Sequence, residues 1–243
     1  MKTLQFFFAL LLGTALTAQT TWYKIATGTH KKLNTIDFPS AKVGYIGGND
    51  SLLLKTTDGG QTWTPLAVTG VTFYIGSQNI VNLDFTSETT GYLLVGPYGA
   101  AYKTTDGGLT WTILQPAGTI CFFGGLYFFD DQNGFIGGSG CFQGEVIDKI
   151  VAGTFSVSTI NHPTWDASDR VVDIDFLDNS FGLAASSGGN ILRTTDGGVT
   201  WDSISSGLAD GIPLTSVAVI DHTLAYAGYK DPGNGAGLLQ TTD

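Results

Sequence analysis

The eight residues Thr56-Thr57-Asp58-Gly59-Gly60-Gln61-Thr62-Trp63 return almost unchanged at 104–111 and 194–201, and Thr241-Thr242-Asp243 opens the same motif again. Successive motif aspartates lie 48, 90 and 47 residues apart, and because ninety is about two periods, one copy is hidden. Residues 147–155 keep the lysine before the turn, the glycine and a bulky aromatic, but have lost the aspartate and the tryptophan. The chain therefore contains five units of about 45 residues, one of them with a degenerate motif.

Each unit has the same internal order of predicted strands. A hydrophobic inner strand comes first, a second strand usually opens with glycine, a third runs into the motif, and a fourth leaves from the tryptophan. Four antiparallel strands in 40 to 50 residues are typical of a β-propeller blade. We therefore predict an all-β fold, a β-propeller of four-stranded antiparallel blades over residues 20–243, with units at about 33–66, 80–114, 121–160, 171–204 and 214–243.

The two ends of the propeller admit two interpretations. Residues 21–25 resemble the start of a fourth strand, and the fifth unit lacks one, so the N-terminal segment could complete the last blade of a five-blade ring. Alternatively, the five units are part of a larger ring. We favour the larger ring, because terminal repeats are normally finished and capped whereas this sequence stops inside its motif.

The motif has the chemistry of a turn. An aspartate at the start of a turn accepts hydrogen bonds from N–H groups two or three residues on, and paired glycines supply positive φ angles. The tryptophan can fold back over the turn and bury its ring. We predict structural roles for the motif residues of every copy that has them: Asp58, Trp63, Asp106, Trp111, Asp196, Trp201 and Asp243.

This motif is similar to the Asp-box, also called the bacterial neuraminidase repeat. Together with the glycine-aromatic second strand and the Lys/Arg before the turn, it resembles the propellers of the photosystem II assembly and stability factor family. The resemblance covers most of the mature chain and implies a propeller fold. It does not specify a function, because sialidases, xyloglucanases, sortilin-type receptors and many exported bacterial proteins share the motif.

Composition limits the class of partner and the compartment. A net charge of −10 and a pI near 4.4 argue against a nucleic-acid partner, which requires a basic surface. Residues 1–19 are typical of a signal peptide, with Lys2, an apolar run over 4–16 and small residues before the expected cleavage near Ala18. No later segment reaches the 18 apolar residues of a membrane span. We expect an exported protein that is secreted, periplasmic or at the cell surface.

An exported protein enters an oxidising environment, in which its two cysteines can form a disulfide. The segment between Cys121 and Cys141 reads as a hairpin with its turn near residue 131, which would place the two cysteines opposite each other. Facing cross-strand positions have the Cα separation that a disulfide requires. We therefore predict a Cys121–Cys141 bond.

The sequence gives little support to an enzyme. Sialidases that this family resembles need three arginines around the substrate carboxylate, but the chain has only Arg170 and Arg193. A xyloglucanase-like mechanism needs two carboxylates across a cleft, for which the candidates lie around Trp165: Asp166, Asp169, Asp173 and Asp175. Their spacing does not match a calcium loop. We expect no catalytic residues, no metal and no cofactor.

The loops opposite the Asp-box turns are the predicted recognition surface. In a four-stranded meander these turns share one face with the turns between strands one and two, so the other loops gather on the opposite face. Those loops vary in length and carry aromatic residues, which we take as the binding residues: Tyr74, Tyr98, Phe142, Trp165 and Tyr229. The predicted function is an exported, non-enzymatic scaffold that binds a protein or a glycan. The alternative is a glycosidase-like propeller whose site is completed by sequence beyond residue 243.

Overall fold

A computed structural model describes residues 24–73, 78–96, 100–115, 120–140, 144–161, 169–209 and 211–241. These residues form strands and turns without any helix, which confirms the all-β propeller prediction. Across these ranges no helix has the length and apolar character needed to span a membrane. The predicted signal peptide lies outside the described residues, so export stays a prediction.

The five sheets are the blades of the propeller, and each begins with its inner strand. Blade 1 contains β1 (Leu33–Asp37), β2 (Gly44–Gly48), β3 (Leu53–Thr56) and β4 (Thr64–Pro65). Blade 2 contains β5 (Asn79–Phe85), β6 (Gly91–Gly96), β7 (Ala101–Thr104) and β8 (Thr112–Gln115). Blade 3 contains β9 (Phe122–Phe128), β10 (Gly134–Gly140), β11 (Gly144–Val151) and β12 (Thr154–Val157).

Blades 4 and 5 depart from the uniform four-stranded pattern. Blade 4 contains β14 (Val171–Phe176), β15 (Gly182–Ser186), β16 (Asn190–Thr194) and β17 (Thr200–Ser205). It gains a fifth strand, β13 (Thr159–Asn161), which runs parallel to β17 and which the sequence pattern did not predict. Blade 5 has three described strands, β18 (Leu214–Val219), β19 (Ala225–Asp231) and β20 (Gly235–Thr241).

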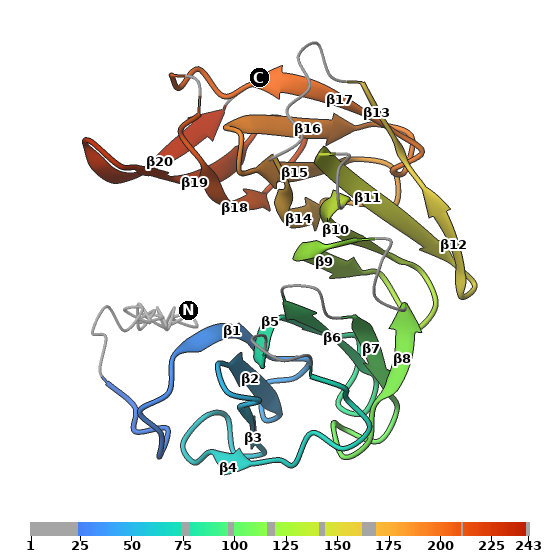
Figure 1. Cartoon of the computed structure of the whole chain (residues 1–243), viewed down its shortest axis with the longest axis vertical. Helices are drawn as coiled ribbons and strands as arrows, with labels where there is room; N and C mark the ends of the chain where they lie inside the picture. The colour runs from blue at the N-terminus through green and yellow to red at the C-terminus, as the bar shows by residue number, and fades with distance from the viewer. Residues whose placement is uncertain are drawn as a thin grey trace, which may run out of the picture.

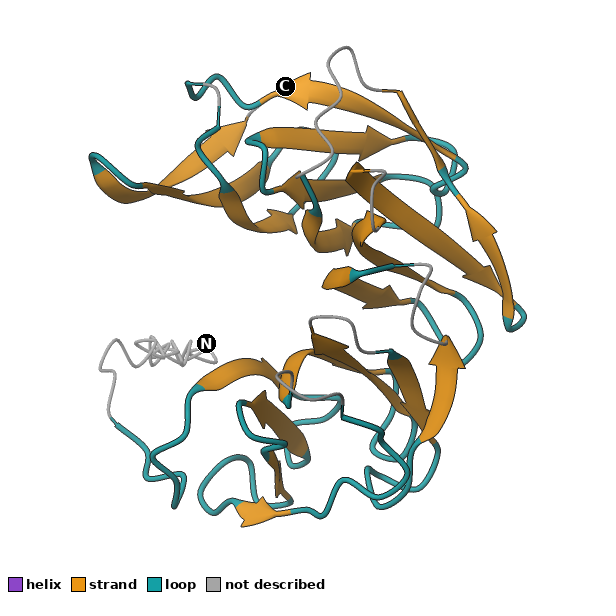
Figure 2. Cartoon of the chain, in the orientation of Figure 1, coloured by secondary structure: helices purple, strands orange, loops and turns teal. Residues whose placement is uncertain are grey.

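The blades follow one another along an open arc (Figure 1). The inner strands β1, β5, β9, β14 and β18 line its concave side, and the outer strands β4, β8, β12 and β17 lie on its convex side. Blades 1 and 5 form the two ends of the arc, and strands joined by turns make up the whole described body (Figure 2).

Stacked aromatic rings join neighbouring blades. The ring of Tyr45 in β2 stacks on Phe85 of the next inner strand, with 3.6 Å between ring centroids. Tyr92 and Phe128 repeat this contact at 3.5 Å in the next seam. The Phe85 ring also requires the glycine that precedes Tyr92, because a Cβ at Gly91 would lie 2.3 Å from Phe85. The glycine-aromatic pattern of the second strands is therefore a device for packing blade against blade.

The cysteine hairpin has an irregular register. β9 and β10 pair through Phe128 and Gly134 near the turn, but the register shifts between Ile136 and Gly138, so that Phe122 faces Ser139. Cys141 lies outside the described residues. The Cys121–Cys141 disulfide therefore stays a prediction.

Candidate functional site

The Asp-box turns are built around their aspartates. Asp106 Oδ1 accepts the backbone N–H of Leu109 at 3.0 Å and of Thr110 at 2.9 Å, and Asp106 Oδ2 accepts the Thr110 hydroxyl at 2.5 Å. These N–H groups are three and four residues on, one further than the turn chemistry predicted. The Thr110 hydroxyl and the N–H donors lower the pKa of Asp106 to about 2. Asp58 and Asp196 make equivalent contacts with Thr62 and Thr200.

The motif tryptophans fold back over their turns. Trp111 is 2% exposed, and its Nε1–H donates to the Gly108 carbonyl at 3.1 Å. Trp63 makes the same bond to Gly60 at 3.1 Å. Trp201 is fully buried, yet its Nε1–H has no partner among the described residues. Asp243, the last motif residue, lies outside the described ranges.

The degenerate motif forms a shorter turn at the same place in the blade: Val151 pairs with Thr154, and six residues separate Lys149 from its partner Ser156, against eight between Lys103 and Thr112. Ala152 and Gly153 have φ angles of 49° and 76°, close to the 73° and 87° of Gly107 and Gly108. Phe155 follows this turn in β12 and packs against the core between blades 2 and 3. The hidden copy is therefore present in the fold, with a smaller aromatic in the place of the tryptophan.

The Asp-box turns share one face with the turns between first and second strands. Backbone N–H groups of Gly59, Gly107 and Gly197 donate across to Lys42, Thr89 and Ser180 at 2.8 to 2.9 Å. Bonds between blades occupy the same face: Lys55 Nζ donates to the Gly107 carbonyl at 3.2 Å, and Tyr45 OH donates to the Glu88 carbonyl at 2.8 Å. The residues of this face are largely engaged in holding the propeller together.

The described carboxylates of the candidate cluster have different surroundings in the structure. Asp173 Oδ2 accepts the backbone N–H of Val217 at 2.9 Å, and Asp175 Oδ2 accepts that of Val219 at 2.7 Å. Burial raises the pKa of Asp173 to about 6. Asp169 lies against Gly188, where a Cβ would be 2.1 Å from its Oδ2, and Asp166 is outside the described residues. Asp173 and Asp175 thus bind the next blade instead of facing each other across a cleft.

The same carboxylate-to-amide bond recurs at other seams, and the sequence analysis missed it. Asp37 Oδ2 accepts the Phe85 N–H at 2.7 Å, and Asp84 Oδ2 accepts the Phe128 N–H at 2.6 Å. Burial raises the pKa of Asp84 to about 7. The sequence signal that could have revealed these bonds is an Asp-Phe pair at the end of three inner strands: Asp37-Phe38, Asp84-Phe85 and Asp175-Phe176.

The structure describes only one of the five predicted binding aromatics. Tyr229 lies in β19, half-buried, with its ring against Gly237 of β20, where a Cβ would be 2.4 Å from the phenol oxygen. This ring packs on its own blade. The other four fall outside the described residues: Tyr74, Tyr98, Phe142 and Trp165.

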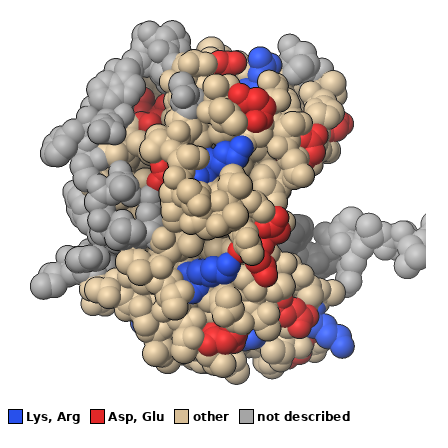
Figure 3. Space-filling view, turned by 90° about the vertical axis from the view of Figure 1, so that its right-hand side faces the viewer, with Lys and Arg blue, Asp and Glu red and all other residues tan. Residues whose placement is uncertain are grey.

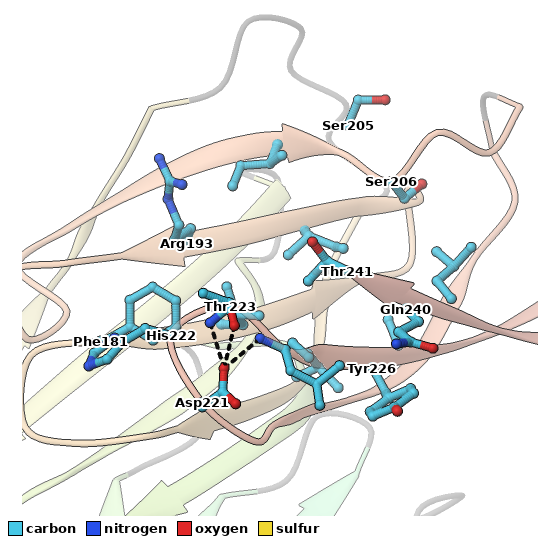
Figure 4. A pocket seen from close by; sticks show the side chains of 18 residues that line it. Phe181, Arg193, Ser205, Ser206, Asp221, His222, Thr223, Tyr226, Gln240 and Thr241 are labelled. Carbon is cyan, nitrogen blue, oxygen red and sulfur yellow. Dashed lines mark hydrogen bonds between the residues drawn. The ribbon is translucent and has the colours of Figure 1, made fainter. Parts of the chain in front are cut away.

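A cavity of about 510 Å³ lies between blades 4 and 5, and the sequence analysis did not anticipate it. Its apolar wall comes from both blades, with Leu183 and Ile191 on one side and Val217, Ala227 and Leu239 on the other. Figure 4 shows Arg193 of β16 at one wall and Gln240 and Thr241 of β20 at another. A cavity of this size is in the range of ligand-binding pockets.

Charge does not define a separate site on the side of the molecule drawn in Figure 3, the side of β8 and β12. Basic side chains there lie beside acidic ones. No single basic field covers the described part of this side.

These features define a β-propeller of the Asp-box type, and comparisons with known proteins agree with it. A family model described as photosynthesis system II assembly factor YCF48 matches residues 14–74, about a quarter of the chain. No curated protein matches the sequence significantly. The resemblance to this propeller family is thereby confirmed.

Three solved structures share the fold. YCF48 bound to D1 peptide aligns with a TM-score of 0.59 and 19% identity over 88% of this chain and 64% of that chain. An ancestral GH74 enzyme aligns with a TM-score of 0.63 and 15% identity over 93% of this chain and 32% of that one. The GH74 xyloglucanase from Xanthomonas campestris aligns with a TM-score of 0.56 and 17% identity, over 81% and 37%. The chain thus spans less than two thirds of each, and these identities show the fold alone.

Proposed function

We propose that this chain is an exported, non-enzymatic β-propeller that binds a protein or glycan partner through the loops opposite its Asp-box turns. The fold is the one seen in YCF48 bound to D1 peptide, which supports a protein partner. Export rests on the signal-peptide pattern of residues 1–19.

The observation that supports this proposal is that hydrogen bonds of the propeller itself occupy the Asp-box face. On the Asp-box face, turn residues hydrogen-bond to the neighbouring turn and to the next blade, as Tyr45 and Lys55 do with the carbonyls of Glu88 and Gly107. These backbone groups are therefore already paired. Recognition is better served by the opposite face, where loops of variable length leave a rigid scaffold.

The carboxylates also favour binding over catalysis. A glycosidase needs one carboxyl to donate a proton and a second to act on the sugar or on water. In the candidate cluster, Asp173 and Asp175 each accept a backbone N–H from blade 5. A carboxylate committed to such a bond holds two blades together, and its movement toward a substrate would break the seam.

The test compares the two faces with matched triple variants. Tyr74→Ala, Tyr98→Ala and Trp165→Ala remove aromatics from the proposed face. The control, Gln61→Ala, Leu109→Ala and Val199→Ala, removes exposed side chains from the Asp-box turns, where Leu109 and Val199 are 58% and 55% exposed.

Wild type and both variants are screened as immobilised residues 20–243 against a displayed peptide library and a glycan array. Peptides or glycans that bind the wild type and the control, but are lost from the loop-face variant at unchanged thermal stability, support the proposal. Equal loss from both variants, or binding that survives the loop-face substitutions, contradicts it.

A glycosidase is the second candidate, because both GH74 enzymes share the fold over most of this chain. Release of reducing ends from xyloglucan would support it. The release should then disappear in the variant Asp169→Asn, because the other two described members of the cluster, Asp173 and Asp175, accept backbone N–H groups of blade 5.

A further inference from the structure

The seam between blades 2 and 3 opens into a cavity of about 300 Å³ on the Asp-box face. Tyr92, Lys103 and Leu114 line it from blade 2, and Asp131 and the turn at 152–153 line it from blade 3. Blades 2 and 3 lie in the middle of the arc (Figure 1), so the cavity involves neither end of the chain. Its volume is at the lower end of the range of ligand-binding pockets.

The cavity arises from the degenerate turn, which is two residues shorter than an Asp-box turn. Six residues lie between Lys149 and Ser156, which pair across this turn, against eight between Lys103 and Thr112. A Cβ at Gly153 would meet no atom within 4 Å, so the short turn ends beside open space. The shorter turn therefore leaves uncovered a part of the seam that a full Asp-box turn would cover.

The seam between blades 1 and 2 shows what a full turn places there. Gly108 of the Asp-box packs on blade 1, where a Cβ would lie 3.2 Å from the side chain of Leu66 and 3.5 Å from the ring of Tyr45. Repeat alignment gives Tyr92 and Leu114 the positions of Tyr45 and Leu66, and both line the cavity. The cavity is therefore the site of an Asp-box glycine that the degenerate turn does not supply.

A full turn also supplies a hydrogen-bond acceptor at this place. In the seam between blades 1 and 2, Lys55 Nζ and Tyr45 OH each lie 3.2 Å from the carbonyl oxygen of Gly107. Lys103 and Tyr92 repeat the arrangement of this lysine and tyrosine, with 5.3 Å between Nζ and the ring centroid against 5.0 Å. The donors of the missing bond are thus in place in the seam between blades 2 and 3, and the acceptor is not supplied by the shortened turn.

The polar groups of the cavity favour a neutral acceptor. Lys103 Nζ donates to the Asp131 carbonyl, and an ammonium group with three N–H donors can serve a second acceptor as well. Burial and the carboxylates of Asp131, Asp130 and Asp84 raise the pKa of Tyr92. The same carboxylates would repel an incoming carboxylate, whereas a peptide carbonyl brings no net charge.

We propose that the cavity between blades 2 and 3 binds a glycine-containing turn of a partner protein. The glycine packs against the Tyr92 ring and Leu114, and a backbone carbonyl of the turn accepts a hydrogen bond from Lys103 Nζ. A side chain does not fit beside the lysine, because a Cβ at Gly107 of the full motif would lie 2.7 Å from Lys55 Nζ. This site lies on the Asp-box face and does not depend on the binding proposed for the opposite loops.

The probe for this site is the chain's own Asp-box turn. A backbone-cyclised peptide with the sequence of residues 104–111, Thr-Thr-Asp-Gly-Gly-Leu-Thr-Trp, carries a fluorescent label. A second peptide has alanine in place of both glycines. Fluorescence anisotropy measures the binding of each peptide to the full chain. We expect the glycine peptide to bind and the alanine peptide to show no binding up to about 1 mM.

Three variants of the chain locate the binding. Lys103→Met removes the donor and should weaken the glycine peptide about tenfold. Lys55→Met changes the matched lysine, whose acceptor Gly107 is already present, and should bind the peptide as the wild type does. In a graft variant, Asp-Gly-Gly-Leu replaces Ala152-Gly153 and restores the eight-residue spacing of the full motif. This variant fills its own cavity and should not bind the peptide.

Circular dichroism and thermal melting show whether each variant keeps the fold. A wild-type chain that binds neither peptide up to about 1 mM overturns the proposal, as does an alanine peptide that binds as tightly as the glycine peptide. A folded graft variant with wild-type affinity also overturns it. If the graft lowers the melting temperature, the two lysine variants decide alone: equal affinity of Lys103→Met and Lys55→Met contradicts the proposal, and a selective loss in Lys103→Met supports it.

Discussion

The carboxylate of Asp84 in blade 2 accepts the backbone N–H of Phe128 in blade 3 at 2.6 Å. The bond crosses between blades at the inner strand, and the ring of the same Phe128 stacks on Tyr92 of blade 2. One residue of blade 3 is therefore held through its backbone and its side chain together. Equivalent bonds from Asp37 and Asp175 fix other seams.

The first prediction concerns the pH dependence of these bonds. Burial raises the pKa of Asp84 to about 7 and that of Asp173 to about 6, against about 3.9 in an unfolded chain. Between pH about 4 and 7 the folded protein therefore holds more protons than the unfolded one, and its stability falls as pH rises. We expect the free energy of unfolding in urea to be about 4 kcal/mol larger at pH 5 than at pH 8, with Asp84 contributing the larger share.

The variant Asp84→Asn isolates the contribution of this one carboxyl. Its amide oxygen can still accept the Phe128 N–H, but it has no charge to bury. The difference between pH 5 and pH 8 should shrink, and the variant should be more stable than the wild type at pH 8. Asp50→Asn, on the exposed turn after β2, serves as the control. A full pH dependence in Asp84→Asn would show that another group carries it.

The second prediction concerns the Asp-box carboxylates, whose contribution to stability decreases as pH falls. Hydrogen bonds from Thr110 lower the pKa of Asp106 to about 2. Stability from this group is present above about pH 4 and is lost as pH falls toward 2. At neutral pH, Asp106→Ala leaves the exposed N–H groups of Leu109 and Thr110 to water and should lower the free energy of unfolding by about 1 kcal/mol. Leu109→Ala, at a 58% exposed side chain of the same turn, should change it by less than about 0.5 kcal/mol.

The third prediction tests the glycine-aromatic seam. A Cβ at Gly91 would lie 2.3 Å from the ring of Phe85, so Gly91→Ala should destabilise the protein by about 1 to 3 kcal/mol. Blade 5 shows how the clash is avoided, because Ala225 stands at the glycine position and Val219 at the position of Phe85. In the Gly91→Ala/Phe85→Val double variant, the two effects should therefore be less than additive in a denaturation cycle. If the two effects simply add, the ring of Phe85 is not what excludes a side chain at position 91.

The periodic side chains were the predictable part of this fold. The spacing of Asp58, Asp106 and Asp196 located the blades, and residues 147–155 supplied the hidden turn. Neither β13 nor the bonds of Asp84 and Asp173 could be predicted in this way, because each depends on which backbone groups a neighbouring blade brings near. The sequence marked Asp173 as acidic and close to Trp165, which is the same signal that a catalytic carboxylate would give. Only the position of the Val217 N–H separates the two roles.

The last prediction compares two tryptophans that the motif makes equivalent. Trp111 Nε1–H donates to the Gly108 carbonyl at 3.1 Å, whereas the corresponding Gly198 carbonyl accepts the Ser158 hydroxyl at 2.6 Å, and the buried Trp201 Nε1–H has no described partner. Substitution by phenylalanine removes a satisfied donor in one case and an unsatisfied one in the other. An unpaired buried donor carries a desolvation penalty, so Trp201→Phe should cost about 1 kcal/mol less than Trp111→Phe. Urea denaturation of both variants measures the difference. In a Ser158→Ala background the Gly198 carbonyl becomes available to Trp201. The two substitutions should then lower the free energy of unfolding by similar amounts. If the difference between them persists, it comes from packing around the rings.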